Sequence, residues 1–179
     1  MRPLTFVTGI YGAGKSTLCK KLSSDIGIEY FKASTLIFNE LKQLPSIDKK
    51  ISDEAHLDAN QQALIAALAR IDTKGNILLE GHTCLLDQNN EVKKIPLAVF
   101  EAIHLEKIVV VTRNITDVQS DLLERDGVKY NTEALKKLQA DELEYTRQIS
   151  QQLNILFLHI DLDCCDIGTA LKTMKKFLE

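Results

Sequence analysis

The stretch Gly9-Ile10-Tyr11-Gly12-Ala13-Gly14-Lys15-Ser16 matches the pattern G-x-x-x-x-G-K-S/T at every fixed position. It directly follows the apolar run Leu4–Thr8, so it predicts a strand, a phosphate-binding loop (P-loop) and a helix that begins near Lys15. Glycines let the loop turn so that its N–H groups point at a bound polyphosphate, and the helix N-terminus adds its positive dipole end. A glycine-rich turn that binds nothing is the alternative. The residues expected to bind the phosphates are Gly9, Gly12, Ala13, Gly14, Lys15, Ser16 and Thr17.

Two side chains of this loop carry specific chemistry. Lys15 supplies a positive charge for the β- and γ-phosphates, and the Ser16 hydroxyl is a ligand for Mg²⁺. The loop therefore predicts ATP and Mg²⁺ as cofactors. We expect the Lys15 side chain to be solvated until nucleotide binds.

Length and charge limit the organisation of the chain. Its 179 residues are 45% hydrophobic and 26% charged, enough for one core, and we expect a single domain over residues 1–179. A net charge of -3 provides no general attraction to nucleic acid or anionic membranes. Met1-Arg2-Pro3 leads straight into the first strand, and no apolar run approaches membrane-spanning length. We expect a soluble cytoplasmic protein with no signal peptide.

The cysteines predict no disulfide or zinc site. None of them forms a C-x-x-C pair, and neighbouring Cys164 and Cys165 have poor geometry for a shared bond or metal. We expect four reduced thiols, at Cys19, Cys84, Cys164 and Cys165.

Apolar runs alternate with helical patterns along the chain. The runs predict five strands, at Leu4–Thr8, Glu29–Lys32, Asn76–Glu80, Lys107–Thr112 and Ile155–Asp161. The patterns between them predict helices at Lys15–Ile26, Thr35–Gln43, Asp53–Ile71, Leu97–Leu105, Ile115–Asp126, Thr132–Leu153 and Ile167–Leu178. This alternation favours an α/β fold with a parallel sheet, helices on both faces and ligands at the carboxyl ends of the strands.

Several segments together resemble one known family. The loop Thr8–Thr17 is similar to that of the nucleoside monophosphate kinases, and Glu80–Thr83 resembles the Asp-Thr-His segment of archaeal-type adenylate kinases. The family order also recurs, with a proline-started helix in Lys94–Phe100, a strand in Val109–Arg113 and an arginine-bearing lid in Leu122–Gly127. The resemblance implies a P-loop NTPase kinase with strand order 2-3-1-4-5. It also implies a short lid at about 124–131 and acceptor-binding helices at about 34–72.

Glu80 and His82 are candidate catalytic residues at the end of an apolar strand. A carboxylate there is costly unless it is paired or ligates an ion, so Glu80 is expected beside Mg²⁺, where the resemblance places an aspartate. A hydrogen-bonded core carboxylate is the alternative for Glu80. The resemblance places His82 near the phosphate acceptor, and a loop histidine capping a strand end is its alternative.

Arginines are the candidate contacts for the transferred phosphate. A guanidinium group can donate two hydrogen bonds to phosphoryl oxygens, which makes Arg125 in the lid the first candidate. Arg113, expected beside the nucleotide, is the second candidate, and Arg147 is the third. Lys129 is expected to assist Arg125. The alternative for all four is a solvated charge paired along its own helix.

The acceptor side departs from the family. The family element Arg-Asp-x-x-Arg for an acceptor phosphate is replaced here by a segment in which Lys49 and Lys50 precede two acidic residues, Asp53 and Glu54. These carboxylates would repel an acceptor phosphate, so AMP is not assured as the acceptor. We expect a polar wall for a sugar or base formed by Ser34, Thr35, Asn39 and Gln62.

The sequence therefore predicts an ATP-dependent phosphotransferase. It would move the γ-phosphate of Mg-ATP in line to a nucleoside monophosphate or a similar small acceptor, with Lys15 and Arg125 neutralising charge. One alternative is a kinase for another small acceptor such as dephospho-coenzyme A, because Glu124–Gly127 also resembles the lid of those kinases. The other is a slow ATPase switch that regulates a protein partner through lid closure.

Overall fold

The structure is a computed structural model of the chain. It describes residues 3–42, 53–73, 75–127 and 129–179, and of residues 53–57 the backbone alone. The predicted roles of Lys49 and Lys50, and of the Asp53 and Glu54 side chains, lie outside the described part.

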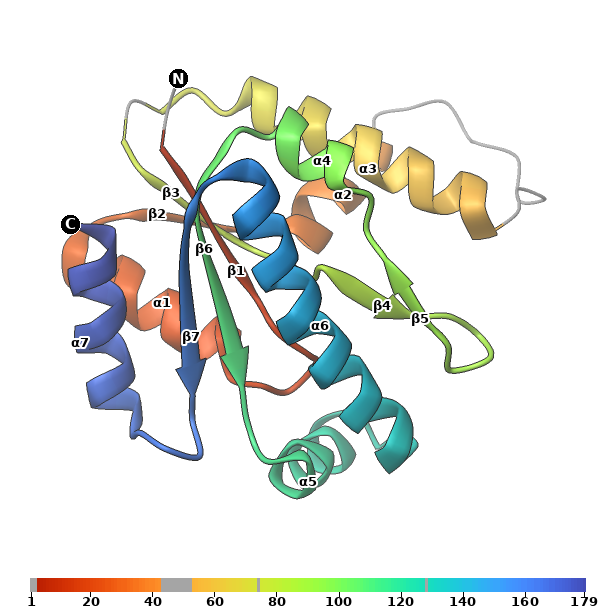
Figure 1. Cartoon of the computed structure of the whole chain (residues 1–179). Coiled ribbons are helices and arrows are strands. Elements are labelled where there is room, and N and C mark those ends of the chain that lie inside the picture. Colours follow the sequence, from red (N-terminus) through yellow and green to blue (C-terminus); the bar gives the residue numbers. More distant parts are fainter. Residues whose placement is uncertain (1–2, 43–52, 74, 128) are drawn as a thin grey trace.

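A five-stranded parallel sheet forms the centre of the molecule (Figure 1). Its strands are β1 (Leu4–Thr8), β2 (Glu29–Lys32), β3 (Ile77–Glu80), β6 (Leu105–Thr112) and β7 (Leu156–Asp161). They lie in the order β2-β3-β1-β6-β7, which is 2-3-1-4-5 when only these strands are numbered, and this confirms the implied topology. Every residue of β1 is buried, because β1 pairs with β3 on one side and β6 on the other.

Helices cover both faces of this sheet (Figure 1). They are α1 (Lys15–Ile26), α2 (Ala33–Lys42), α3 (Asp53–Arg70), α4 (Leu97–Ala102), α5 (Ile115–Asp126), α6 (Thr132–Leu153) and α7 (Ile167–Leu178). Helix α1 packs against α7 and the strands β1 to β3, α6 packs against β6, and α2 packs against α3. The α/β fold with a parallel sheet is confirmed.

Four of the helices, α1, α5, α6 and α7, have the predicted bounds, since each has a clear cap. The Asn131 side chain accepts from the Ala134 N–H at the start of α6, and Gly127 ends α5 in the left-handed conformation. Helix α4 was predicted to run to Leu105 and ends at Ala102. His104 takes a left-handed φ of 54°, and Leu105 already pairs with Leu4 in the sheet. The other boundaries shift by one or two residues.

A two-stranded hairpin escaped the sequence analysis. It consists of β4 (Cys84–Leu86) and β5 (Val92–Lys94), which are antiparallel and pack against α6. Asp87 shapes the connection by accepting hydrogen bonds from the N–H groups of Asn89 and Glu91. Strands of three residues are too short to show an alternating pattern, so only the turn residues could have indicated the hairpin.

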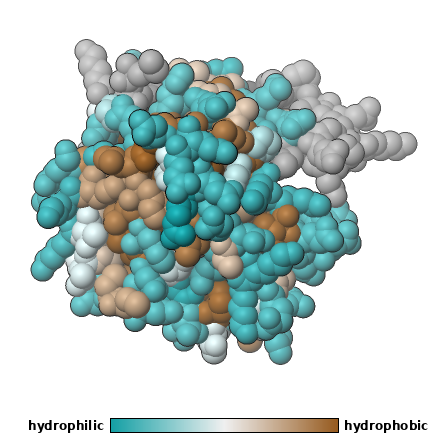
Figure 2. All heavy atoms as spheres, in the orientation of Figure 1, coloured by the Kyte–Doolittle hydropathy of each residue, from teal (hydrophilic) through white to brown (hydrophobic). Residues whose placement is uncertain are grey.

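The face of the molecule shown in Figure 2 is mainly polar, with apolar side chains in separate areas. The large apolar side chains most exposed among the described residues are Phe38 on α2, Leu123 on α5 and Leu156 on β7. Within the described ranges, no helix combines the length and hydropathy needed to cross a bilayer. All four cysteines carry free thiols, as predicted.

Candidate active site at the carboxyl edge of the sheet

The P-loop connects β1 to α1 through glycines that no other residue could replace without strain. A Cβ at Gly9, whose φ is 145°, would lie 2.3 Å from the carbonyl oxygen of Val111 in β6. Gly14 takes a φ of 96° immediately before α1, and its carbonyl accepts from the N–H groups of Thr17 and Leu18. The predicted strand, loop and helix are confirmed, and the loop residues 12–17 line a large cleft.

Lys15 is buried inside the loop, although the sequence analysis expected it to be solvated. It is 5% exposed, and its ammonium donates to the carbonyls of Gly9 at 2.6 Å and Ile10 at 2.8 Å. Burial lowers the pKa of Lys15, and the charges of Glu142 and Glu80 act in the opposite direction. The expectation was wrong because the loop folds around the side chain and satisfies it with backbone oxygens.

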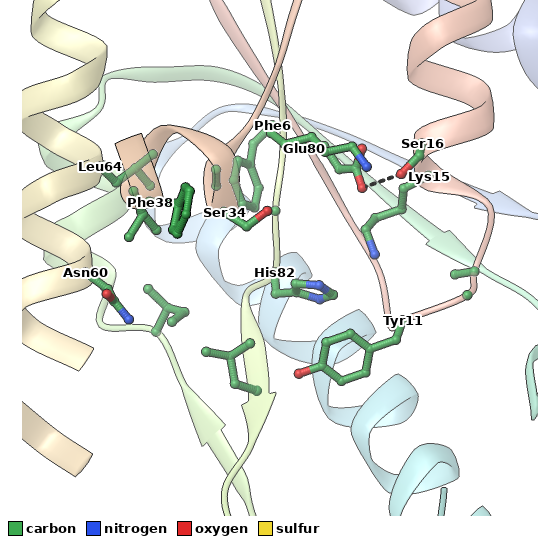
Figure 3. A pocket seen from close by; sticks show the side chains of 18 of the residues that line it. Phe6, Tyr11, Lys15, Ser16, Ser34, Phe38, Asn60, Leu64, Glu80 and His82 are labelled. Carbon is green, nitrogen blue, oxygen red and sulfur yellow. Dashed lines mark hydrogen bonds between the residues drawn. The ribbon is translucent and has the colours of Figure 1, made fainter. Parts of the chain in front are cut away.

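Ser16 and Glu80 meet at the end of β3. The Ser16 hydroxyl donates to Oε1 of Glu80 at 2.7 Å (Figure 3), and the Tyr30 hydroxyl donates to Oε2. Glu80 reaches this place because it pairs in register with Val7 at the end of β1. A hydroxyl beside a carboxylate is a donor set that Mg²⁺ accepts when phosphate oxygens and water complete its shell. No cluster of three His, Cys, Asp or Glu capable of holding a metal occurs among the described residues.

Glu142 of α6 joins the P-loop to the strand ends, and the sequence analysis missed it. It is fully buried, and its Oε1 accepts from the Thr8 hydroxyl at 2.5 Å, the Gly9 N–H at 3.2 Å and the Thr83 N–H at 3.0 Å. A signal was present: Glu142 interrupts the buried stripe that contains Leu138 and Tyr145. A carboxylate inside an apolar helix stripe requires partners, and here they come from β1, the P-loop and the segment between β3 and β4.

The surroundings of Glu142 keep it ionised. Burial alone would raise its pKa, but His82, the Lys15 charge and the hydrogen bond from Thr8 outweigh burial, and the pKa lies below its ordinary value. His82 Nδ1 is 3.7 Å from Oε1, which is too long for a hydrogen bond. Lys15, Glu80 and Glu142 thus form one electrostatic group around the loop.

His82 lies in the middle of the cleft. Figure 3 shows Lys15 and Tyr11 on one side of it and Ser34 and Phe38 on the other. Its ring packs against that of Tyr11, with centroids 4.7 Å apart, and Tyr11 stacks in turn on Tyr130. His82 therefore lies between the P-loop and the far end of the cleft, and its place near a phosphate acceptor stays a prediction.

Two of the predicted arginines line the cleft. Arg113 is 2.5 Å from Asp121 and donates to the Gly12 carbonyl at 3.5 Å, while Arg125 makes two 2.7 Å hydrogen bonds to Asp126. Arg125 belongs to the last turn of α5, which ends at Asp126 as predicted. Each guanidinium is therefore held by a carboxylate of α5.

The structure does not bring Arg147 and Lys129 into this group. Arg147 pairs with Glu144 on the surface of α6 and lies over the Phe157 ring, and Lys129 is exposed. Neither residue lines the cleft.

The cleft, about 1190 Å³ in volume, extends from the P-loop to α2, α3 and α4. The end away from the loop is mainly apolar, and six of its lining residues are Phe6, Ile37, Phe38, Leu64, Val99 and Phe100.

Ser34 lines this far end as predicted, but the rest of the polar wall differs. Thr35, Asn39 and Gln62 are exposed and lie outside the lining. Asn60 and Gln61 take their place. The buried stripe of α3, with Ala63, Leu64, Ala67 and Leu68, turns Gln62 to solvent. The sequence did not show which side of α3 faces the cleft, because α3 carries apolar residues on more than one side.

A family model described as an AAA domain matches residues 8–139. The chain belongs to this family. The AAA domain match begins at the last residue of β1 and ends within α6, so it contains the P-loop, Glu80, His82 and the cleft arginines. Glu142 follows three residues after its end.

A relative in sequence comes from Thermococcus onnurineus and carries the name "Putative adenylate kinase". It is 34% identical over 77 residues, a match that covers 42% of this AAA domain chain and 38% of the relative. The chain thus aligns with less than half of that protein.

Solved structures share the fold over nearly the whole chain. A deoxyadenosine kinase from M. mycoides, solved with dCMP and a flexible dCDP, has a TM-score of 0.61 at 17% identity, covering 98% of this chain and 97% of that one. A sugar kinase from Janibacter sp. has a TM-score of 0.59 at 14% identity, covering 99% and 95%. At these identities the neighbours show a shared fold, and with the family match over residues 8–139 they confirm the P-loop α/β fold that the resemblance implied.

Glu142 should make the stability of this AAA domain depend on pH. Since its folded pKa is depressed, its ionised form contributes stability at neutral pH that is lost as pH falls through the folded pKa. We expect the difference in unfolding free energy between wild type and Glu142→Gln to shrink as pH falls below the ordinary value of 4.5. Urea unfolding of both proteins from about pH 7 to about pH 3 measures this difference in free energy. The other carboxylates contribute equally to both proteins, so their contributions cancel in the comparison. A difference independent of pH would contradict the depressed pKa.

Proposed function

We propose that the protein is an ATP-dependent kinase that moves the γ-phosphate of Mg-ATP to a nucleoside monophosphate or a similar small, nucleotide-like acceptor. The observation that carries this proposal is a single cleft lined at one end by the P-loop, Glu80 and two arginines, and at the other by α2 and α3. His82 lies between the two ends (Figure 3). Donor and acceptor could therefore meet in line above the strand ends.

The residues of the loop end divide the work of phosphate transfer. Backbone N–H groups of residues 12–17 and the Lys15 ammonium would hold the β- and γ-phosphates, and Arg113 would assist at the nucleotide. Ser16 and Glu80 would hold Mg²⁺, which when bound neutralises charge on the phosphates. Arg125 would move from Asp126 onto the transferring group, and no covalent enzyme intermediate is required.

The other elements would serve the acceptor. Helices α2 and α3 would form its binding side, with Ser34, Asn60 and Gln61 as polar contacts. The segment at about 124–131 would act as a short lid over a single P-loop kinase domain.

Transfer of γ-labelled phosphate from Mg-ATP tests the proposal directly. The acceptors are nucleoside monophosphates, deoxynucleotides, nucleosides and dephospho-coenzyme A, each beside a reaction without acceptor. One acceptor labelled far above that control supports the kinase and names its substrate. Label released only as inorganic phosphate would contradict the kinase and favour the ATPase switch with a protein partner.

Substituting Arg125 should slow the chemical step. We expect Arg125→Ala to lower kcat by about 10² to 10³, the usual loss for one preorganised charge contact to the transition state. Arg147→Ala is the matched control, because Arg147 is also half exposed and paired with a carboxylate but does not line the cleft. Steady-state kinetics with the best acceptor measures both. An unchanged kcat in Arg125→Ala would show that Arg125 does not contact the transferring phosphate.

A further inference from the structure

We infer that Lys32 binds the phosphate group of the acceptor, so that the acceptor is a phosphate monoester such as a nucleoside monophosphate rather than an uncharged nucleoside or sugar. The inference rests on the proposed kinase function and narrows its acceptor. It concerns the part of the cleft at the end of β2, where Lys32 is one of the lining residues. The family's arginine element for an acceptor phosphate is replaced in this sequence, so another cation has to bind that group.

Lys32 is the cleft cation whose charge the described residues leave unpaired. Four lysine and arginine side chains in the described part of the chain line the cleft: Lys15, Lys32, Arg113 and Arg125. Each arginine pairs with a carboxylate of α5, and Lys15 donates to two P-loop carbonyls. The ion pairs and side-chain hydrogen bonds among the described residues do not include the Lys32 ammonium. The charge of this half-buried ammonium therefore remains for an anionic ligand.

The register of the sheet places Lys32 across β3 from the P-loop. Lys32 pairs with Glu80 of β3, and Glu80 pairs with Val7 of β1. The P-loop begins at Gly9, directly after β1. Neighbouring strands lie about 4.8 Å apart, so β2 and β1 are separated by about 10 Å. A γ-phosphate on the loop and an acceptor phosphate at Lys32 would therefore meet above the end of β3.

Glu80 lies next to Lys32 in the sheet but does not pair with it. The two carboxylate oxygens of Glu80 accept from the hydroxyls of Ser16 and Tyr30. Tyr30 precedes Lys32 by two residues, so both side chains lie on the same face of β2. The Lys32 ammonium is thus beside the proposed place of transfer without belonging to the hydrogen-bonded group that holds Glu80.

The start of α2 adds a neutral donor and no opposing charge. Helix α2 begins directly after Lys32, and its first turn contains no acidic residue. Ser34 lies in that turn and lines the cleft, and its hydroxyl can donate to a phosphate oxygen. Lys32 remains the residue on which the inference depends, because it supplies the full charge.

A phosphate acceptor needs a cation at this point because two anions must approach each other. The second ionisation of a phosphate monoester has a pKa of about 6, so at neutral pH an acceptor oxygen attacks without losing a proton. That oxygen forms a bond to the γ-phosphorus while the bond from this phosphorus to the β,γ-bridging oxygen breaks, and ADP leaves with the electron pair. Lys32 would bind the other oxygens of the acceptor phosphate and reduce the repulsion between the two anions.

Matched acceptors test the substrate class. Wild-type protein with γ-labelled Mg-ATP is given adenosine, cytidine, guanosine, uridine and their deoxy forms, and in parallel the 5′-monophosphate of each. We expect at least one monophosphate to be labelled, with a kcat/KM about 100-fold or more above that of its nucleoside. Equal kcat/KM for the two, or transfer to nucleosides alone, would overturn this inference and leave an ATP-dependent kinase. Transfer to no acceptor would overturn both.

Substitutions of Lys32 test the residue itself. Lys32→Met removes the charge but keeps an unbranched apolar chain, and Lys32→Arg keeps the charge. We expect Lys32→Met to raise the KM for the monophosphate by about 10- to 100-fold, the usual effect of losing one hydrogen bond to a charged group. Lys32→Arg should stay within about tenfold of wild type. The KM for Mg-ATP should change less than about threefold in both variants, because Lys32 does not bind the donor.

Lys20→Met is the matched control, since Lys20 is exposed on α1 and lies outside the cleft. We expect it to leave both KM values unchanged. A wild-type KM for the monophosphate in Lys32→Met would overturn the role of Lys32 while leaving the proposed kinase intact. An increase in the KM for Mg-ATP alone would do the same, because Lys32 would then serve the donor.

Binding without turnover separates a contact with the phosphate from a general loss of structure. Calorimetric titration of the labelled monophosphate and of its nucleoside, both without ATP, gives the two Kd values for wild type and Lys32→Met. We expect the substitution to weaken the monophosphate by about 10- to 100-fold and the nucleoside by less than about threefold. Equal weakening of both ligands would overturn the inference. Lys32→Gln supplies a second neutral side chain should Lys32→Met fail to fold.

Discussion

Replacing Lys15 by alanine is expected to lower kcat for phosphate transfer by about 10³-fold or more. Lys15 is the one cation buried within the described part of the P-loop, and its ammonium already lies among the loop carbonyls. Without the Lys15 ammonium, the negative charge that develops on the β- and γ-phosphates would have no nearby positive charge in a site of low dielectric constant. Rapid-quench measurement of labelled phosphate transfer gives the rate of the step itself.

The same substitution should also weaken the fold. The carbonyls of Gly9 and Ile10 lose their donor, which costs about 1 to 3 kcal/mol when water cannot replace it. Lys20→Ala is the matched control, since Lys20 lies exposed on the same helix α1 and outside the cleft. A Lys15→Ala protein that stays folded and transfers phosphate at the wild-type rate would contradict the proposed role of the P-loop.

Replacing Glu142 by alanine is expected to reduce the free energy of unfolding by about 3 kcal/mol or more. The Thr8 hydroxyl and the Gly9 N–H lose the acceptor that they share, and Lys15 loses a neighbouring negative charge. Thr8 ends β1, Gly9 lies in the P-loop and Lys15 begins α1, so the substitution in α6 affects all three of these segments. Urea denaturation gives the free energy when the two-state assumption holds.

Glu144→Ala is the control for that experiment. Glu144 lies on the same helix, is exposed, and pairs only with surface side chains of α6 such as Arg147. We expect its substitution to change stability by less than about 0.5 kcal/mol. Equal effects of the Glu142 and Glu144 substitutions would refute the view that the buried carboxylate holds the site together.

The elements of the fold could be predicted where local signals agree. Caps, apolar stripes and the P-loop glycines all act within a few residues, and they located four helices at their observed bounds and all five strands of the main sheet. The hairpin of β4 and β5 was missed because three-residue strands carry too little pattern. The end of α4 was missed because Leu105 is apolar enough for either a helix or a strand, and its pairing with Leu4 decided for the strand.

Parts of the site followed from motifs, and other parts did not. The contact between Ser16 and Glu80 was expected, since a P-loop and a neighbouring strand end meet at one edge of a parallel sheet. The burial of Lys15 was not, because it depends on how the loop closes around the side chain. Likewise, Asn60 and Gln61 face the cleft instead of Gln62 because packing fixes the rotation of α3 about its own axis.

The sequence by itself determined the P-loop, the strand-helix alternation and the residue types available for phosphate chemistry, because these depend on short spacings and backbone freedom. Only the tertiary structure decided which distant groups share a site. Glu142 lies 134 residues from Thr8 and 60 from His82 along the chain, yet it touches both. A buried carboxylate is stable only where several donors converge on it, and that convergence results from packing α6 across the ends of β1 and β3.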